Sequence, residues 1–461
     1  MYAKALDDNK EMLIQSLQEI IRIKSVMGEP VGDMPFGEGI QNSLEFILKL
    51  GESMGFKTKN VDNYAGYIEF GEGKEMLGIL CHLDVVPEGD GWSHGPYSGD
   101  LVDGKIYGRG TLDNKGPAIS SLYAMKALKD SGFIPKKRIR LILGTNEENG
   151  SECIQYYLKN EEKPTVAFSP DADFPVIHGE MGIIVFDLEM KFEDMDNDGG
   201  IEIIALHGGN APNMVPDYAE ATLIETRPIK DIVHAFNKTR QANIEYTTVD
   251  GFTILKSHGV SAHGSTPDKG VNAISQLLTL LDLVDIQIGD QSNFVRFLAK
   301  RIGMDYDGKN MGIGFDDAYN KLVLNLGMID LNKDKGKATI NVRYPITLKE
   351  SKVKMALDST VRGTGVDLTN WRCAQPLFFP PNHPLVKTLM EVYIAKTGDT
   401  EAKPITIGGG TYARSLPNAI AFGALFPGAE DTMHQKDEYV TVDDLLKMTD
   451  IFAEAIHKLS M

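Results

Sequence analysis

Apolar positions in the first 177 residues alternate between a helical period and continuous strand-like runs. Residues 11–26 carry an apolar stripe that predicts a helix. A second helix is predicted from Lys115 to Gly132, because Pro117 suits a first helical turn and a glycine suits the position after a helix end. Buried strands are predicted by the apolar runs at 76–83, 138–145 and 165–169. This alternation predicts an α/β domain with a mostly parallel central sheet and flanking helices.

The pattern changes after residue 177, where longer strands of alternating polarity appear. Helices are predicted between these strands near 229–241, 271–285 and 349–359. We therefore expect an inserted α+β domain with antiparallel sheets at 178–377, built as one unit or as two related halves. The α/β pattern returns at 378–461, with a helix at 384–397, a strand at 419–426 and a final helix at 441–459. The α/β domain thus comprises 1–177 and 378–461.

Composition narrows the possible functions of the chain. It has 461 residues and a formal net charge of −18, which argues against a nucleic-acid surface because phosphate binding requires clustered Lys and Arg. Cys81, Cys153 and Cys373 are odd in number and far apart, so no disulfide framework is indicated. The N-terminal segment lacks the apolar core of a signal peptide, and no apolar run reaches the ~18 residues of a membrane span. These features predict a cytoplasmic protein that acts on neither nucleic acid nor membrane.

Five polar clusters stand out, although each is ordinary when taken alone. A His near an Asp at a strand end is more often structural, an Asp before a helix is usually an N-cap, and adjacent loop glutamates are usually only solvated. The clusters are His82-Leu-Asp84, the segment around Asp113, Glu147-Glu148, Ser-Pro-Asp171, and the segment that begins at His434.

Their shared position changes this interpretation. The first four clusters are expected at the carboxyl ends of parallel strands, and the fifth follows the last such strand. Ligands of open α/β sheets bind at that edge. Two histidines and several carboxylates that converge there suit a pair of zinc-like ions with a bridging carboxylate. Since two such ions activate water for hydrolysis, one neighbouring glutamate should remain unligated and serve as the base.

The order of the motifs resembles a known family. HLDVVP at 82–87, YGRGTLDNKGP at 107–117, EENGS at 147–151 and SPDADFP at 169–175 are similar to motifs of the zinc-dependent exopeptidases that include aminoacylase, carboxypeptidase G, desuccinylase and carnosinase. HGSTPDKGVNA at 263–273, GGGTYAR at 408–414 and the final GAEDTMHQKDE extend this resemblance over nearly the whole chain. Within the family, the chain most resembles the bacterial PepV-like dipeptidase branch.

The resemblance implies a role for each residue of the α/β domain site. The first ion would be bound by His82 and Asp171, and the second by Glu148 and His434, with Asp113 bridging the two. Asp84 would orient His82, and Glu147 would be the general acid/base. The family also implies a cis peptide bond between Asp113 and Asn114. The two divalent ions would be zinc, with manganese or cobalt as alternatives that the ligand types also accept.

The resemblance also implies roles in the inserted domain, which would act as a lid. His263 would stabilise the tetrahedral oxyanion, and Asn210 and Arg343 would bind the terminal carboxylate of the substrate. Gly408 and Gly409 would let backbone amides approach the substrate closely. Without the resemblance, an exposed loop histidine and a surface salt bridge would be the simpler interpretations of His263 and Arg343. The length of the lid implies a monomer that completes its own site.

Three functions therefore remain open from the sequence. The first is hydrolysis of dipeptides that have a free N-terminus, and the second is deacylation of N-acyl amino acids by the same metal site. The third is a metal-binding or peptide-binding module without turnover, which the presence of Glu147 argues against.

The acidic segment Asp194–Gly199 resembles the start of an EF-hand loop, but Ala205 stands where that loop needs its last glutamate. We therefore interpret this segment as a solvated acidic turn.

Overall fold

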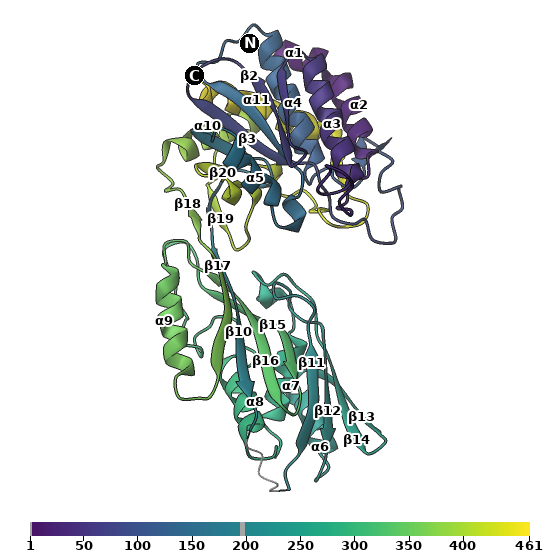
Figure 1. The fold of residues 1–461 in the computed structure, drawn as a ribbon, viewed down its shortest axis with the longest axis vertical. Coiled ribbons are helices and arrows are strands. Elements are labelled where there is room, and N and C mark those ends of the chain that lie inside the picture. The colour runs from purple at the N-terminus through teal and green to yellow at the C-terminus, as the bar shows by residue number, and fades with distance from the viewer. Residues whose placement is uncertain (1, 194–198) are drawn as a thin grey trace. The chain divides into compact units, whose positions relative to one another are not determined.

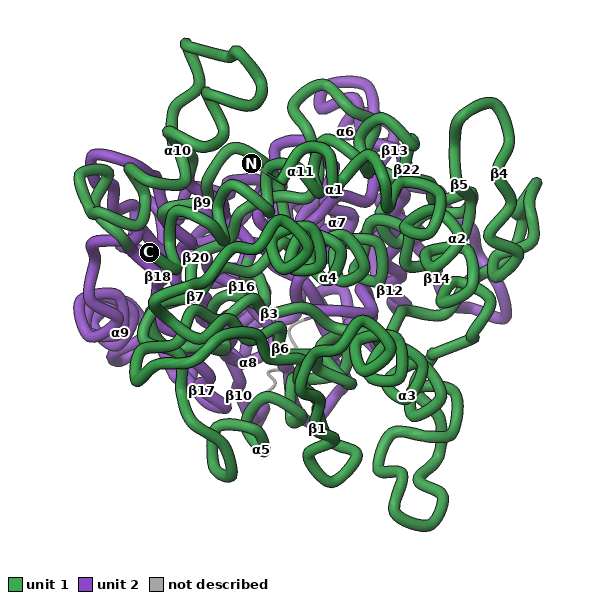
Figure 2. The backbone as a smooth tube through the Cα atoms, turned by 90° about the horizontal axis from the view of Figure 1, so that it is seen from above, with its two compact units in different colours: residues 1–178, 379–405, 410–461 green, residues 179–378, 406–409 purple. Residues whose placement is uncertain are grey.

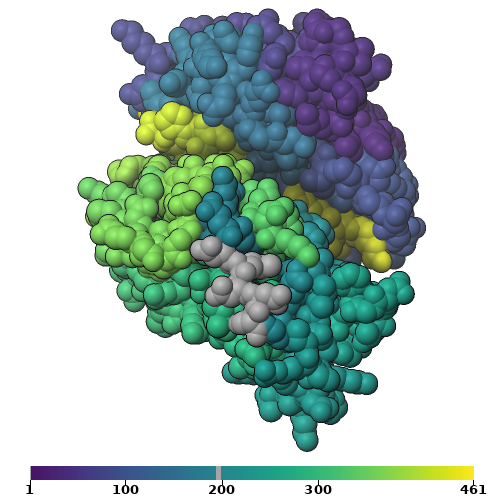
Figure 3. All heavy atoms as spheres, turned by 60° about the horizontal axis from the view of Figure 1, so that its bottom comes forward, coloured from purple at the N-terminus to yellow at the C-terminus, as the bar shows by residue number. Residues whose placement is uncertain are grey.

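The computed structural model of the chain describes residues 2–193 and 199–461 (Figure 1). Positions 194–198 are drawn in grey (Figure 3), and most of the acidic segment Asp194–Gly199 therefore lies outside the described residues. The chain forms two compact units (Figure 2). Unit 1 comprises residues 1–178, 379–405 and 410–461, and unit 2 comprises 179–378 and 406–409. Unit 2 thus includes five residues, Phe378 and 406–409, that lie within the 378–461 part of the sequence division.

The main sheet of unit 1 runs in the order β1-β2-β6-β3-β7-β20-β9. Its strands are β1 (Lys57–Val61), β2 (Ala65–Phe70), β3 (Met76–His82), β6 (Arg138–Gly144), β7 (Val166–Ser169), β9 (Ile177–Glu180) and β20 (Ala419–Ala421). The central strands β6, β3, β7 and β20 are parallel, whereas the strands on either side of them pair antiparallel. The predicted mostly parallel sheet is confirmed, and its unbroken apolar runs are explained by burial on both faces.

Helices cover both faces of this sheet (Figure 1). They are α1 (Ala3–Asp8), α2 (Lys10–Ile21), α3 (Glu38–Ser53), α4 (Lys115–Asp130), α5 (Glu152–Asn160), α10 (Pro384–Thr397) and α11 (Val442–Leu459). Alternate residues of β3, including Ile79 and Cys81, join the hydrophobic cluster that holds α4 and α11. The opposite face carries α5, where Arg140 of β6 donates a hydrogen bond to Tyr157 over 3.0 Å. Because side chains alternate along a strand, His82 lies on the face opposite Cys81.

Two small sheets complete unit 1 and correct two expectations. One sheet joins β4 (Asp100–Val102), β5 (Lys105–Tyr107) and β22 (Tyr439–Thr441), and the other pairs β8 (Ala172–Asp173) with β21 (Ala424–Leu425). The cluster around Asp113 therefore follows β5 of an antiparallel sheet and not a central parallel strand. The predicted strand at 419–426 is wrong as one element, since it divides into β20 and β21 at Gly423, whose φ is +83°.

Unit 2 is built on a single antiparallel sheet with the order β13-β14-β12-β11-β15-β16-β10-β17. Its strands are β10 (Gly182–Lys191), β11 (Glu202–Gly208), β12 (Tyr218–Ile224), β13 (Asn243–Val249), β14 (Phe252–His258), β15 (Val323–Leu331), β16 (Lys335–Tyr344) and β17 (Asp367–Ala374). The short strands β18 (Leu377–Phe378) and β19 (Ile405–Ile407) lie where the chain passes between the units. The antiparallel α+β character is confirmed, in the form of one continuous sheet.

One hydrophobic cluster unites this sheet with four helices, since it contains buried residues of each. The helices are α6 (Lys230–Arg240), α7 (Ala273–Leu281), α8 (Asp290–Arg301) and α9 (Glu350–Val361). The sequence pattern predicted three of them, and α8 is an addition. In the described part of the chain, no helix has the length and apolar character needed to cross a membrane.

The core of unit 1 makes a quantitative prediction possible. Phe168 of β7 is fully buried, with its ring centre 6.0 Å from those of Phe422 and Phe452. We expect Phe168→Ala to lower the free energy of unfolding of unit 1 by ~3–5 kcal/mol, because it leaves a cavity in a close-packed core. Urea unfolding followed by tryptophan fluorescence in a Trp371→Phe background measures this, since Trp92 then reports on unit 1 alone.

The control is Ile134→Ala, at a side chain that is 85% exposed. It should change the unfolding free energy by no more than about 0.5 kcal/mol. Equal effects of the two variants would contradict this assignment of the core.

Candidate metal centre

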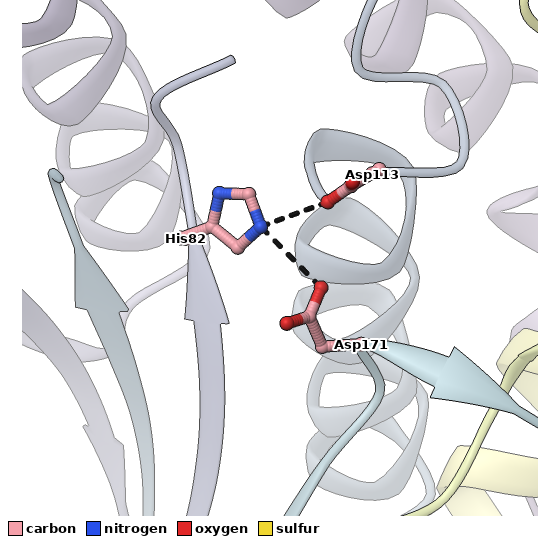
Figure 4. A group of neighbouring side chains, drawn as sticks. All are labelled: His82, Asp113 and Asp171. Atoms are coloured by element: carbon pink, nitrogen blue, oxygen red, sulfur yellow. Dashed lines mark hydrogen bonds and ion pairs between the residues drawn. The ribbon is translucent and has the colours of Figure 1, made fainter. Parts of the chain in front are cut away.

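Within the described residues of unit 1, two groups of potential metal ligands converge. The first contains His82, Asp113 and Asp171 (Figure 4), and the second contains Asp113, Glu148 and His434. In each group the donor atoms lie within 4.8 Å of one another. Asp113 belongs to both groups, so all five sequence-predicted metal ligands come together around one carboxylate.

Asp113 directs a different oxygen to each group. Its Oδ1 lies 2.9 Å from Nε2 of His82, and its Oδ2 lies 2.9 Å from Nε2 of His434. His82 Nε2 is also 3.3 Å from Asp171 Oδ1, and His434 Nε2 is 3.1 Å from Glu148 Oε1. A carboxylate with one oxygen in each of two ligand groups is the arrangement that a bridging ligand requires.

The protonation of His82 follows from its other nitrogen. Nδ1 lies 2.9 Å from the backbone carbonyl oxygen of Asp84, which can only accept a hydrogen bond. Nδ1 therefore carries a proton, and Nε2, which faces the two aspartates, is the nitrogen that could bind a metal ion after losing its own proton. In histidines that bind metals, the second ring nitrogen typically donates its proton to an acceptor of this kind. The donor set thus fits divalent cations.

The Asp84 carboxylate holds the two neighbouring glutamates by their backbone. Its Oδ1 and Oδ2 accept the N–H groups of Glu147 and Glu148, each over 3.0 Å. These glutamates form the short 3-10 helix η1 (Glu147–Asn149), directly after β6. Asp84 thereby ties the end of β6 to the end of β3. Among the described residues, Glu147 belongs to neither converging ligand group, although it follows the same strand as Glu148.

The carboxylates of this site are difficult to ionise without cations. Burial raises the pKa of Glu147 to about 8, and the negative charge of Asp171 adds to this effect. Burial also raises the pKa of Glu148 and of Asp171. Asp113 differs, because hydrogen bonds from His434 and His82 outweigh its burial and lower its pKa. Crowded, partly buried carboxylates are the electrostatic condition in which bound cations stabilise a site most.

The histidines show the complementary effect. Hydrogen bonding to Asp113 and then to Glu148 raises the pKa of His434 to about 10. Burial lowers the pKa of His82, but the charge of Asp171 and hydrogen bonds to the surrounding aspartates outweigh it and raise the pKa well above its usual value. Protons and metal ions therefore compete for the same nitrogens.

Asn114 is a structural contributor that sequence reasoning did not single out. Its Nδ2 donates to the backbone carbonyl of Pro170 over 2.8 Å and to Asp171 Oδ1 over 2.9 Å, and its Oδ1 accepts the His82 N–H over 3.3 Å. Asn114, and not Asp113, is the N-cap residue of α4. The peptide bond between the two residues is cis, which confirms the prediction made from the family resemblance.

Glu438 is a second contributor that the sequence did not identify. This fully buried carboxylate accepts backbone N–H groups from Gly110, Leu112 and Asp113 over 3.1, 2.9 and 3.3 Å. Arg109 donates to its other oxygen over 2.6 Å. Glu438 thus connects the segment of His434 to the loop that presents the shared aspartate. Its only signal in the sequence is a place in HQKDE, since burial of a glutamate cannot be inferred from neighbouring residues.

The remaining predicted residues lie in unit 2, where Arg343 is a neighbour of both Gly408 and His263. Arg343 donates from Nη1 to the backbone carbonyl of Gly408 over 3.1 Å. Burial, together with the positive charge of Arg343, lowers the pKa of His263. Met214 forms a β-bridge with His263. Met214 and Asn210 both line a cavity with a volume of about 580 Å³. Gly409 follows Gly408 at the end of this unit.

Comparison with known proteins identifies the family. Residues 78–458 match the family described as "Peptidase family M20/M25/M40". The chain belongs to this peptidase family. A protein called "Putative dipeptidase YtjP" from Bacillus subtilis is 40% identical over 458 residues, with 98% of each chain covered.

Solved structures show the same fold at low sequence identity. Human carnosine dipeptidase 1 matches with a TM-score of 0.58 and 15% identity, over 99% of this chain and 98% of that one. Aminoacylhistidine dipeptidase from Vibrio alginolyticus matches with a TM-score of 0.59 and 15% identity, over 97% and 96% of the two chains. The predicted combination of an α/β domain with an inserted antiparallel domain is therefore confirmed.

The buried contact between Glu438 and Arg109 leads to a test of the metal centre. We expect Glu438→Gln to lower the free energy of unfolding of unit 1 by ~3–5 kcal/mol, because it leaves the Arg109 guanidinium buried without its counter-charge. Metal occupancy should fall with it, since the Asp113 loop loses its anchor. Urea unfolding monitored through Trp92 in the Trp371→Phe background and metal analysis of the purified protein measure the two effects.

Glu430→Gln is the matched control, because Glu430 is an exposed glutamate of the same segment. It should retain wild-type stability and metal content. If Glu438→Gln behaved like this control, Glu438 would not support the centre.

Proposed function

We propose that the chain is a metal-dependent dipeptidase that hydrolyses dipeptides with a free N-terminus. The observation that carries the proposal is the shared Asp113, which offers one oxygen to each of two histidine-and-carboxylate groups. Family membership and the dipeptidase name of the relative from Bacillus subtilis support the same activity. In this proposal His82 and Asp171 hold one divalent ion, Glu148 and His434 hold the other, and Asp113 bridges them.

Bound divalent ions would supply the positive charge that acidifies water and polarises the peptide carbonyl. The residues of the chain would then handle the protons. Glu147 would accept a proton from the attacking water and deliver it to the nitrogen of the leaving amino acid. Glu147 follows the same strand as Glu148 but belongs to neither ligand group of the described residues, as a residue that carries protons beside the ions requires. Asp84 would keep Glu147 in place through the backbone hydrogen bond and would orient His82.

Residues of unit 2 would bind the negative parts of the substrate. A cluster of carboxylates repels the C-terminal carboxylate of a dipeptide, so cationic and neutral donors are needed for it. We assign this role to Arg343 and Asn210, with backbone groups of Gly408 and Gly409 beside the bound peptide. His263 would donate a hydrogen bond to the oxygen on which negative charge develops during attack. Every residue assigned a role belongs to this one chain, as a catalytic monomer requires.

A substrate panel tests the activity and separates it from its alternative. The panel contains dipeptides with a free N-terminus, the same dipeptides acetylated at the N-terminus, and N-acetyl and N-succinyl amino acids. We expect turnover of the free dipeptides alone, in line with the dipeptidase name of the relative from Bacillus subtilis. Turnover of the N-acyl amino acids alone would identify a deacylase, and no turnover by metal-loaded protein would contradict both enzymatic functions.

Removal of the metal should abolish activity reversibly. We expect protein treated with a chelator to lose its dipeptidase activity and to recover it after addition of zinc, manganese or cobalt, with two ions bound per chain. An Asp113→Ala variant should bind fewer ions, because both ligand groups lose a member. Elemental analysis measures the stoichiometry, and full occupancy in Asp113→Ala would contradict the bridging role.

Glu147 can be tested separately from metal binding. We expect Glu147→Gln to lower kcat by about 10²–10⁴-fold, because an amide cannot transfer the proton. The variant should keep two ions per chain, since Glu147 is proposed as a non-ligand. Glu152→Gln, at an exposed glutamate of α5, is the control and should retain full activity. Loss of an ion from Glu147→Gln would contradict the assigned role.

A further inference from the structure

His263 lies in a loop of unit 2 whose backbone is held on both sides. The N–H of Gly264 donates to the carbonyl of Asn213 over 2.7 Å, and the N–H of Thr266 donates to the carbonyl of His263 itself over 2.9 Å. Met214 pairs with His263 in a β-bridge. The ring therefore projects from a defined position, and its chemistry depends on which nitrogen carries the proton.

Two groups of Ser265 converge on the same nitrogen of that ring. The Ser265 hydroxyl oxygen lies 2.6 Å from Nδ1, and the Ser265 backbone N–H lies 3.3 Å from it. A hydroxyl can donate or accept, but a backbone N–H can only donate. If Nδ1 carried a proton, that proton and the proton of the backbone N–H would face each other, and no hydrogen bond could form. Nδ1 is therefore the acceptor for both groups, and the single proton of the neutral ring resides on Nε2.

Neighbouring groups keep the ring neutral and the serine in place. Burial and the positive charge of Arg343 lower the pKa of His263. At neutral pH the ring is therefore uncharged and carries a single proton on one of its two nitrogens. Arg343 is itself held by the carbonyl of Gly408. A side chain at Gly408 would meet Ser265, since a Cβ atom there would lie 2.8 Å from the Ser265 Cβ. The glycine thus leaves room for the serine beside the histidine.

We propose that Ser265 is a positioning residue that fixes His263 in the tautomer with its proton on Nε2. This inference rests on the proposed role of His263 as an oxyanion donor. In the fixed tautomer, Nε2–H can donate to the oxygen of the attacked peptide bond. In the other tautomer, Nε2 would present a lone pair to the same developing negative charge, and the interaction would be repulsive. Ser265 thereby acts through His263 and does not touch the reacting atoms.

Nitrogen NMR of protein labelled with ¹⁵N-histidine tests the tautomer directly. The signals of His263 are assigned by their absence from the His263→Ala spectrum. We expect wild-type His263 to show a protonated Nε2 and an unprotonated Nδ1 at neutral pH. In Ser265→Ala, which lacks the shorter of the two contacts, the population with protonated Nδ1 should rise. Ser265→Thr restores a hydroxyl and should return the wild-type spectrum.

Kinetics provide the second readout. We expect Ser265→Ala to lower kcat by roughly tenfold with little change in KM, which is less than the 10²–10³-fold loss typical when an oxyanion donor is removed. Ser265→Thr should recover the activity. The matched control is Ser351→Ala, at an exposed serine of α9 in the same unit, and it should behave like wild type in both measurements.

The two readouts separate this inference from the proposed function. A wild-type ring with its proton on Nδ1, or a Ser265→Ala spectrum identical to wild type, would overturn the inference even if dipeptides are hydrolysed. If instead the chain hydrolyses no dipeptide, or if His263→Ala keeps full activity, the proposed function fails. The NMR measurement still decides the tautomer in that case, because it does not depend on turnover.

Discussion

Mutual repulsion among partly buried carboxylates is the constraint on which the site of unit 1 depends. Asp113, Asp171, Glu147 and Glu148 crowd around two imidazole rings. Their own charges and their removal from water make full ionisation unfavourable, as the raised pKa values of three of them show. Divalent cations relieve both effects at once, because they neutralise the charge and replace the lost solvation. A cluster of carboxylates that is electrostatically unfavourable without cations is therefore suitable for holding metal ions.

Such a cluster keeps its geometry only if its members are held from outside. Backbone N–H groups and neutral amides do most of this work, since they add donors without adding charge. Asp84 accepts the N–H groups that begin η1, Asn114 joins the ends of β3 and β7, and the N–H of Tyr412 donates to Asp171 over 3.3 Å. Glu438 is the exception, because it is a further buried carboxylate. Its charge is balanced by Arg109, and its three backbone donors fix the loop of Asp113.

Unit 2 presents the opposite chemistry. Arg343 is a buried cation held by Asn341 and by the carbonyl of Gly408, and its charge favours the neutral form of His263. Donors of this kind suit the carboxylate of a peptide and the oxygen on which charge develops during hydrolysis. A candidate cation site and a set of residues proposed to bind anions are thus built on separate sheets. The proposed activity assigns the metal ions to the first and the negative groups of the substrate to the second.

The sequence by itself determined the elements and the residue types of the site. Helical periodicity predicted α10 at its observed bounds and α11 to within one residue, because these patterns depend on local spacing. The strand ends of β3, β6 and β7 were also predicted, and with them His82, the two glutamates and Asp171. The residues also pointed to the segments of Asp113 and His434, and the family motifs supplied their assigned roles and the cis peptide bond.

Only the tertiary structure decided how these residues are supported. It showed that Asp113 arrives from an antiparallel sheet, that β20 and β21 are separate, and that Glu438 is buried beneath the site. It also placed the hydroxyl of Ser265 on Nδ1 of His263. Burial and hydrogen bonds depend on segments that are far apart in the chain, as between Glu438 and Arg109. The local spacing of residues therefore cannot predict them. For this protein, sequence named the candidate groups of the site, and packing decided their protonation and orientation.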